Sequence, residues 1–140
     1  LVARGAGARE TRRLEKGVFL PGTEIGPDCN PVEAGLSWTV GWNTDFRGKE
    51  AVAAVRSNGP ARKLVGFNLT ERGIPRKDYP IQDAAGNTIG MVTSGTQSPS
   101  LGQAIGLGYV AQEWSAKGAE IFISIRGKSI GAVVTGIPFL

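Results

Sequence analysis

The second half of the chain consists of short segments in which apolar residues alternate with small or polar ones, and this alternation constrains the fold most. In the segment 63–71, Val65, Phe67 and Leu69 fall on one face, because successive side chains of a strand point to opposite faces. The pattern recurs up to residue 136, which predicts five or six short strands within about eighty residues. Closing such a sheet removes its unpaired edges, so we expect a small antiparallel β-barrel or jelly roll.

Turn-forming residues separate the predicted strands. Residues 80–95 are typical of two strands around the turn Ala84–Asn87, where small residues interrupt the alternation. A tight turn is expected at Gly127-Lys128, between the last two strands. The segments expected to form the three further strands are 104–110, 119–127 and 129–136.

Gly106 and Gly108 alternate with apolar residues and leave one face of their strand bare. A bare face lets another backbone or a ligand approach closely. Glycines at the corners of a tightly coiled barrel explain the same pattern equally well.

The string Thr93–Gly102 is rich in hydroxyl groups, as a nucleophile loop would be. Because the chain has no histidine that could act as a base, we interpret the string as a turn between strands. The turn-forming pairs in it are Ser94-Gly95 and Ser98-Pro99.

The first sixty residues have a different pattern. Residues 7–16 are rich in helix formers and are followed by Gly17, which predicts a short helix with a glycine stop. Prolines and glycines between Val18 and Pro31 indicate an ordered, irregular loop.

Residues 34–42 and the segment after them predict a strand and a helix. The strand would carry one apolar face made of Leu36, Trp38, Val40 and Trp42. Asp45 is a candidate cap for a helix from about Arg47 to Ser57, which would end at Gly59-Pro60. The buried stripe expected for this helix is Ala51, Val52, Ala54 and Val55.

These patterns together predict an α+β protein that is mainly β. The change of pattern after Pro60 divides the chain into a first unit, residues 1–60, and a C-terminal β-barrel domain, residues 61–140.

Composition excludes several kinds of chemistry. Without histidine, Ser-His and Cys-His catalysis is excluded, and the single cysteine, Cys29, excludes a cysteine-cluster metal site, so we expect no metal. The net charge of +4 suits an anionic ligand as well as it suits nucleic acid. Because the basic residues are scattered and aromatic residues are few, a nucleic-acid-binding module is only a rival interpretation.

Two residues stand out as candidate ligand contacts. Glu15 lies at the end of the first predicted helix, where the helix dipole disfavours a carboxylate, so it either pairs with Arg12 or serves another purpose. Arg76 lies in a loop stiffened by Pro75 and Pro80. Such a loop can hold a guanidinium against a carboxylate, although a solvated surface charge explains the residue as well.

Six segments in one order resemble a known family. They are GARETRRLEKG, NPVEAGLSW, DFRGKEA, RKLVGFNLTERGIPR, YPIQDAAGNTIGMVTSGTQSPSLGQAIGLGYV and IPF. Together they extend from about Gly5 to Phe139 and are similar to the glycine cleavage T-protein, or aminomethyltransferase, family. The segment Gly86–Gly102 favours this family over its flavin-linked relatives.

The resemblance implies a function for the intact protein. Members bind tetrahydrofolate, as a co-substrate, in a cavity among their domains. They transfer a methylene unit to it from the aminomethyl group on the lipoyl arm of the H-protein and release ammonia. Residues 1–60 would then be the C-terminal remnant of the folate-binding core. The implied partners are folate and the lipoylated H-protein, with neither nucleic acid nor membrane.

The resemblance also assigns residues. Glu15, in RLE, matches the glutamate that binds the pterin ring, and Arg76, in GIPR, matches a basic residue near the folate. The family's catalytic aspartate lies far upstream, and no segment here matches its motif. We therefore expect no catalytic residue in this chain and no turnover by the chain alone.

Two other functions fit the sequence besides the transferase. The intact protein is either the aminomethyltransferase or a relative that binds folate without transferring the unit, and the basic barrel that binds protein or nucleic acid is the second alternative. The single cysteine and the charged start of the sequence favour the bacterial cytoplasm, or the mitochondrial matrix in a eukaryote.

Overall fold

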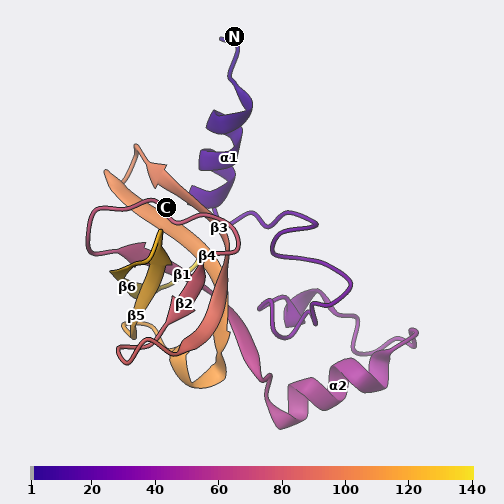
Figure 1. The fold of residues 1–140 in the computed structure, drawn as a ribbon. Helices are drawn as coiled ribbons and strands as arrows, with labels where there is room; N and C mark the ends of the chain where they lie inside the picture. Colours follow the sequence, from indigo (N-terminus) through magenta and orange to yellow (C-terminus); the bar gives the residue numbers. More distant parts are fainter. Residues whose placement is uncertain (1) are drawn as a thin grey trace.

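The structure is a computed structural model that describes residues 2–140. Two helices, α1 and α2, precede a run of six strands, with a short 3₁₀ helix in each half of the chain (Figure 1). The elements are α1 Ala6–Glu15, η1 Ser37–Thr39, α2 Lys49–Asn58, β1 Arg62–Leu69, β2 Pro80–Gln82, β3 Thr88–Ser98, β4 Gln103–Ala111, η2 Gln112–Trp114, β5 Glu120–Ile125 and β6 Lys128–Thr135.

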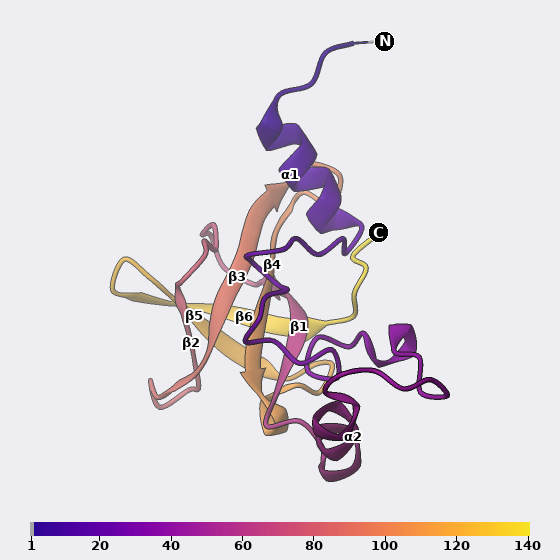
Figure 2. The same cartoon turned by 90° about the vertical axis from the view of Figure 1, so that its right-hand side faces the viewer.

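The six strands form a closed barrel in the order β1-β4-β3-β2-β5-β6. Every neighbouring pair is antiparallel, including β1 with β6, which closes the barrel. The prediction of a mainly β protein with a small antiparallel barrel is therefore confirmed. Both helices lie outside the barrel, as Figures 1 and 2 show.

Alternation along the strands separates the barrel interior from its outer face. Val65, Phe67 and Leu69 of β1 all point into the interior, as predicted. The interior cluster is completed by Ile81, Val92, Ala104, Val110, Ile121, Ile123, Ala132 and Val134. Burying these side chains is the main favourable contribution to folding.

The bare face of β4 points into the barrel. A side chain at Gly106 would meet the Phe67 ring, and one at Gly108 would meet the Ile81 side chain. The glycines therefore make room for two large core residues, and the space beside them is filled by protein rather than by a ligand.

The strand predicted for residues 34–42 is wrong. This segment forms turns and the short helix η1, and Trp38 is 82% exposed. The Trp42 indole N–H donates to the Ser37 carbonyl oxygen, so the segment folds back on itself. The Leu64 amide of β1 donates a backbone hydrogen bond of 2.8 Å to the Glu33 carbonyl oxygen just before this segment, but residues 34–42 form no strand.

The helix predicted near residues 47–57 exists as α2, but two details of it are wrong. Gly48, not Asp45, occupies the position before the helix, and no side chain caps it. No residue of α2 is buried, because the helix lies beside the barrel instead of on its core.

Two predicted turns are also displaced. Ser94-Gly95 belongs to β3, which continues to Ser98, so only the Ser98-Pro99 end of the string 93–102 forms a turn. The turn between β5 and β6 is made by Arg126 and Gly127, both with positive φ, and Lys128 begins β6.

Candidate functional site

The helix α1 lies against the outer face of β3 and β4 (Figure 2). Its central contact is Leu14, which is 2% exposed and packs with Ile105, Leu107 and Tyr109 of β4. Helical periodicity then places Glu15 on one side of this contact and Arg13 on the other. The helix therefore divides the outer face into two regions.

A β-bulge prepares β3 for this helix. The register shifts between Val92 and Ser94, so Val92 points into the core whereas Ser94 faces outward. Because alternate residues of a strand share a face, Thr96 and Ser98 then also face outward.

Three hydroxyl groups of β3 bind three side chains of α1. Ser94 Oγ accepts from Arg13 Nη2 at 2.6 Å, and Thr96 shares a hydrogen bond of 3.0 Å with Thr11. Ser98 Oγ donates to Glu15 Oε1 at 2.5 Å. The hydroxyl-rich string of the sequence is therefore the surface to which α1 is attached.

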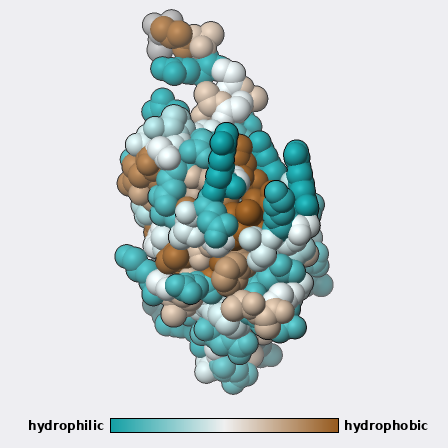
Figure 3. All heavy atoms as spheres, turned by 60° about the vertical axis from the view of Figure 1, so that its left-hand side comes forward, coloured by the Kyte–Doolittle hydropathy of each residue, from teal (hydrophilic) through white to brown (hydrophobic). Residues whose placement is uncertain are grey.

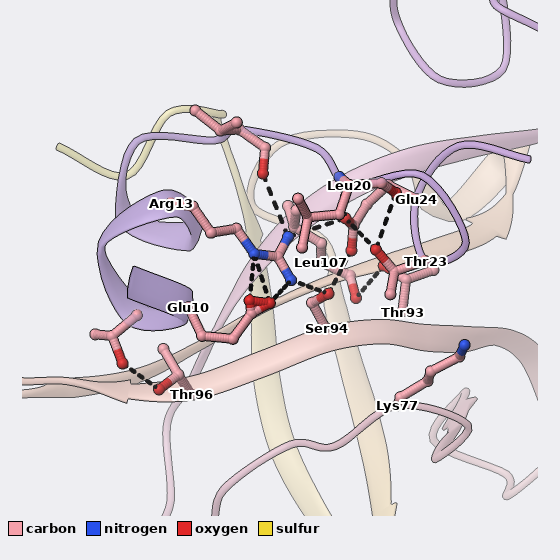
Figure 4. A network of polar contacts seen from close by, with 12 residues as sticks. Glu10, Arg13, Leu20, Thr23, Glu24, Lys77, Thr93, Ser94, Thr96 and Leu107 are labelled. Carbon is pink, nitrogen blue, oxygen red and sulfur yellow. Dashed lines mark hydrogen bonds and ion pairs between the residues drawn. The ribbon is translucent and has the colours of Figure 1, made fainter. Parts of the chain in front are cut away.

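On the Arg13 side, a buried ion pair lies at the centre of a polar network (Figure 4). Glu24 is fully buried, and its Oε2 lies 2.9 Å from Arg13 Nη1. The Glu24 carboxylate also accepts hydrogen bonds from Ser94 Oγ, Thr23 Oγ1 and the Leu20 amide. The network ties the irregular loop after α1 to the helix and to the barrel.

The environment of Glu24 keeps it charged. Burial acts to raise the pKa of its carboxyl group, but the hydrogen bonds and the Arg13 charge together hold that pKa below its ordinary value. Neither Glu24 nor Arg13 was predicted from the sequence, because neither occupies a position that a local pattern distinguishes.

On the other side of α1, Glu15 is 4% exposed and borders a hollow of about 640 Å³. We call it the Glu15 hollow; its walls are the Thr11 and Glu15 side of α1, the end of β3 with the turn after it, and Leu140. The Ser98 hydrogen bond is the main cause that lowers the pKa of Glu15, and it outweighs the effect of burial. At neutral pH a carboxylate therefore faces this hollow.

Glu15 does not form the ion pair with Arg12 that was one interpretation of it. The ion pairs found among residues 2–140 do not include Glu15. Arg12 is exposed and acts on Glu15 only as a more distant charge, which slightly favours the ionised form.

Arg76 lies in a different place. It is exposed and lines a second hollow, of about 580 Å³, between α1 and β3 on the Arg13 side; we call it the Arg76 hollow. The structure therefore does not bring Glu15 and Arg76 into one hollow. Gly7 and Thr11 line both hollows, so the two are neighbours around the beginning of α1.

A third hollow, of about 630 Å³, is chiefly apolar. Its walls include Phe19, Leu36, Trp38 and Ile137, and no Asp or Glu lines it. Figure 3 shows one face of the molecule, on which apolar side chains gather between hydrophilic ones. The Glu15 hollow differs from this third hollow because it places a buried carboxylate beside open space.

Two features are absent from residues 2–140. No group of three or more His, Cys, Asp or Glu side chains in this range is placed to hold a metal ion. No helix in the same range has the length and apolar character needed to cross a membrane.

Known proteins match the chain over most of its length. Residues 62–140 match the family described as the glycine cleavage T-protein C-terminal barrel domain. The chain is 47% identical, over its whole length, to the aminomethyltransferase of Halothermothrix orenii, of which it covers 39%. Over 99% of its length it is 49% identical to the aminomethyltransferase of Moorella thermoacetica, of which it covers 38%.

A solved structure has the same fold. The crystal structure of the glycine cleavage system aminomethyltransferase T from Bartonella henselae matches 95% of this chain with a TM-score of 0.89 and 38% identity. The match covers 38% of that protein. The chain thus spans about two fifths of the length of these relatives.

Proposed function

Because the chain belongs to the glycine cleavage T-protein family, as its six segments predicted, we propose that it is the C-terminal part of an aminomethyltransferase. The intact protein would transfer a methylene unit from the aminomethyl-lipoyl arm of the H-protein to tetrahydrofolate and release ammonia. In this proposal residues 1–60 complete the folate-binding core, and residues 61–140 are the barrel domain on which that core rests.

The observation that carries the proposal is the buried carboxylate of Glu15 beside its hollow. A pterin presents an amino group next to a ring N–H, and an ionised carboxylate accepts two parallel hydrogen bonds from such a pair. Hydrogen bonding keeps Glu15 ionised at neutral pH, which is the state that this recognition needs. The volume of about 640 Å³ is within the usual range for ligand sites.

We assign Arg76 to an anionic part of the same ligand. Its guanidinium is exposed on the stiffened loop and is free of ion pairs with the described carboxylates. An extended ligand would reach from the Glu15 hollow to the Arg76 hollow around the beginning of α1, where Gly7 borders both, because the Thr11–Thr96 hydrogen bond joins α1 to β3 between them. Arg76 would then bind the negatively charged end.

The chain would bind and orient the ligand without carrying out the transfer itself. No residue here matches the family's catalytic aspartate, so the transfer would depend on the part of the relatives that this chain does not cover. The lipoylated H-protein would likewise be a partner of the intact protein. We assign the intact protein to the bacterial cytoplasm, or to the mitochondrial matrix in a eukaryote.

Calorimetric titration with a reduced folate tests the proposal. The titrated samples are the 140-residue chain, a polypeptide extended to the length of the relatives, and Glu15→Ala in both. We expect the chain to bind weakly, the extended polypeptide to bind more tightly, and Glu15→Ala to weaken binding at least tenfold. The matched control is Glu50→Ala, which removes an exposed carboxylate from α2. Equal affinity in the Glu15 pair would overturn the assignment.

The family assignment does not favour the alternative of a basic barrel that binds nucleic acid. That alternative predicts oligonucleotide binding that weakens steeply as salt is added. We expect undetectable oligonucleotide binding at low salt, measured by fluorescence anisotropy.

A further inference from the structure

The helix α2 ends at Asn58, and Gly59 follows it. These two residues form the one Asn-Gly pair in the sequence. In such a pair the backbone nitrogen of the glycine can attack the side-chain carbonyl carbon, Cγ, of the asparagine, because glycine has no side chain to hinder the approach. The attack requires an accessible asparagine, a glycine nitrogen that is not held in a hydrogen bond, and a backbone that can rotate.

The reacting atoms of this pair are accessible. Asn58 and Gly59 are both exposed. Within residues 2–140, no backbone hydrogen bond of the Gly59 amide is found, so its nitrogen is not held by the helix. A side-chain carbon placed on Gly59 would meet nothing within 4 Å, which shows that the space around this peptide bond is open.

The backbone around the pair is free to rotate. The helix α2 has no buried residue, and no side chain caps its beginning. A short helix without buried contacts is only marginally stable, and its last turn opens first. Opening of that turn lets the Gly59 nitrogen reach Asn58 Cγ.

Each of the other asparagines lacks one of these requirements; they are Asn30, Asn43, Asn68 and Asn87. Asn30 precedes a proline, whose nitrogen carries no hydrogen to give up. The amide after Asn43 donates to the Gly41 carbonyl oxygen at 3.0 Å. The residues after Asn68 and Asn87 belong to β1 and β3, where pairing with neighbouring strands holds the backbone. The requirements are therefore met together only at Asn58.

We propose that Asn58 is a site of spontaneous deamidation. A bond forms between the Gly59 nitrogen and Asn58 Cγ, the Gly59 nitrogen loses its proton, and the side-chain nitrogen of Asn58 leaves as ammonia. The product is a cyclic imide, or succinimide. Water then opens this ring at either of its carbonyl carbons, which leaves an aspartate or an isoaspartate, in which the main chain runs through the former side chain. Water is the only co-reactant.

The modification places a negative charge at an unfavourable end of α2. The last carbonyl groups of a helix carry a negative partial charge, so a carboxylate there destabilises the helix. Arg56, the basic residue of the last turn, lies over the Trp42 ring, and side chains two positions apart in a helix do not face each other. Isoaspartate also lengthens the main chain just before the short connection 59–61 that leads to β1. Deamidation should therefore loosen α2.

Mass spectrometry of tryptic peptides tests the reaction on the 140-residue chain incubated in mildly alkaline buffer. Cleavage after Arg56 and Arg62 releases Asn58 in a peptide separate from that of Asn43. We expect the unmodified Asn58 peptide to be lost with time and replaced by two products of equal mass, in which OH replaces NH₂. The peptide of Asn43, which is also exposed, is the internal control and should persist. Loss of the Asn58 peptide no faster than that of the Asn43 peptide would overturn the proposal.

Hydrogen exchange followed by NMR tests the consequence for α2. Asn58→Asp reproduces the aspartate product, and the matched control is Asn58→Gln, which keeps the side chain uncharged. We expect α2 amides to exchange about twofold to fivefold faster in Asn58→Asp, which corresponds to the usual effect of a charge at a helix end, and β4 amides to be unaffected. Equal α2 exchange in the two variants would show that the effect on the helix is wrong. Neither measurement uses a folate, so both are independent of the proposed function.

Discussion

At the scale of single residues, the balance at Glu24 determines how the loop after α1 is held. A fully buried carboxylate is costly unless it is paired and hydrogen-bonded. The Glu24 carboxylate forms an ion pair with Arg13 of α1. It also accepts hydrogen bonds from Ser94 of β3 and from Thr23 of its own loop. The Tyr109 hydroxyl adds a hydrogen bond of 2.9 Å to the Glu24 carbonyl oxygen. Three parts of the chain therefore depend on one carboxylate.

Replacing Arg13 should expose this dependence. In Arg13→Ala the Glu24 carboxylate remains buried without its ion-pair partner, a change that typically costs about 3–5 kcal/mol. Urea denaturation followed by circular dichroism measures the loss in the free energy of unfolding. Arg9→Ala is the matched control, because Arg9 is exposed on the same helix. Equal losses in the two variants would show that the pair does not stabilise the fold.

Stability should fall in acid for the same reason. The pKa values of Glu15 and Glu24 both lie below their ordinary value of 4.5 in the folded chain. The unfolded chain thus takes up these protons first, so the stability that the two groups contribute is present above about pH 4.5 and is lost as pH falls through the lowered values. Urea midpoints measured from pH 7 to pH 3 should decrease below pH 4.5. A midpoint that is constant to pH 3 would contradict this.

The sequence indicated only part of this site. Glu15 stood out because a carboxylate is unfavourable at a helix end, which is a local signal. The partners in the Glu24 network lie 11, 70 and 81 positions apart. Their pairing depends on the bulge in β3 and on the path of the loop, so no local pattern reveals it.

At the scale of elements, β4 makes close packing of the barrel possible. Gly108 faces the interior, where a side-chain carbon would lie 2.6 Å from Ile81 Cδ1 and 2.7 Å from the Met91 carbonyl oxygen. Interiors are close-packed, and a backbone oxygen in a sheet has little freedom to move away. The strand can therefore accept only glycine there without rearrangement.

Gly108→Ala should accordingly destabilise the barrel. We expect a loss of about 1–3 kcal/mol in the free energy of unfolding, which is typical of an overpacked core. Gly136→Ala is the control, because open space surrounds Gly136. Thermal unfolding of the two variants distinguishes them, and a Gly108→Ala protein as stable as Gly136→Ala would contradict the packing argument.

The helix α2 should be the least stable of the regular elements. It has no buried residue, and no side chain caps its beginning; Arg56 stacks on the Trp42 ring at 4.3 Å. Helices of this length are only marginally stable in water when neither buried contacts nor a cap supports them. Hydrogen exchange followed by NMR should show α2 amides exchanging much faster than those of β4. Comparable protection of the two elements would contradict this expectation.

The alternation of apolar residues with small or polar ones predicts a strand correctly where both faces of the segment have a defined environment in the fold. In β1 the apolar face lies in the barrel interior, so the pattern and the structure agree. Residues 36–42 carry the same alternation but pair with no strand, and Trp38 is exposed. A pattern records which residues are apolar, but it does not record whether a partner surface exists.

At the scale of the whole molecule, the barrel is a platform for α1. The hydroxyls of β3 hold the helix, the helix carries Glu15, and the C-terminal residues complete the Glu15 hollow. The Phe139 and Leu140 amides both donate to the Glu15 carbonyl oxygen at 3.1 Å, which holds the C-terminal residues against the end of α1. Helix α1 and the barrel thus build the hollow jointly.

Locating a reduced folate on the chain by ¹⁵N–¹H NMR tests directly whether the Glu15 hollow is the ligand site. Added at millimolar concentration to the 140-residue chain, the ligand should shift the amides of Glu15, Ser98 and Ser100, which line the Glu15 hollow. These shifts should disappear in Glu15→Gln and persist in Glu50→Gln. Shifts that concentrate around Trp38 or α2, or that remain unchanged in Glu15→Gln, would contradict the account.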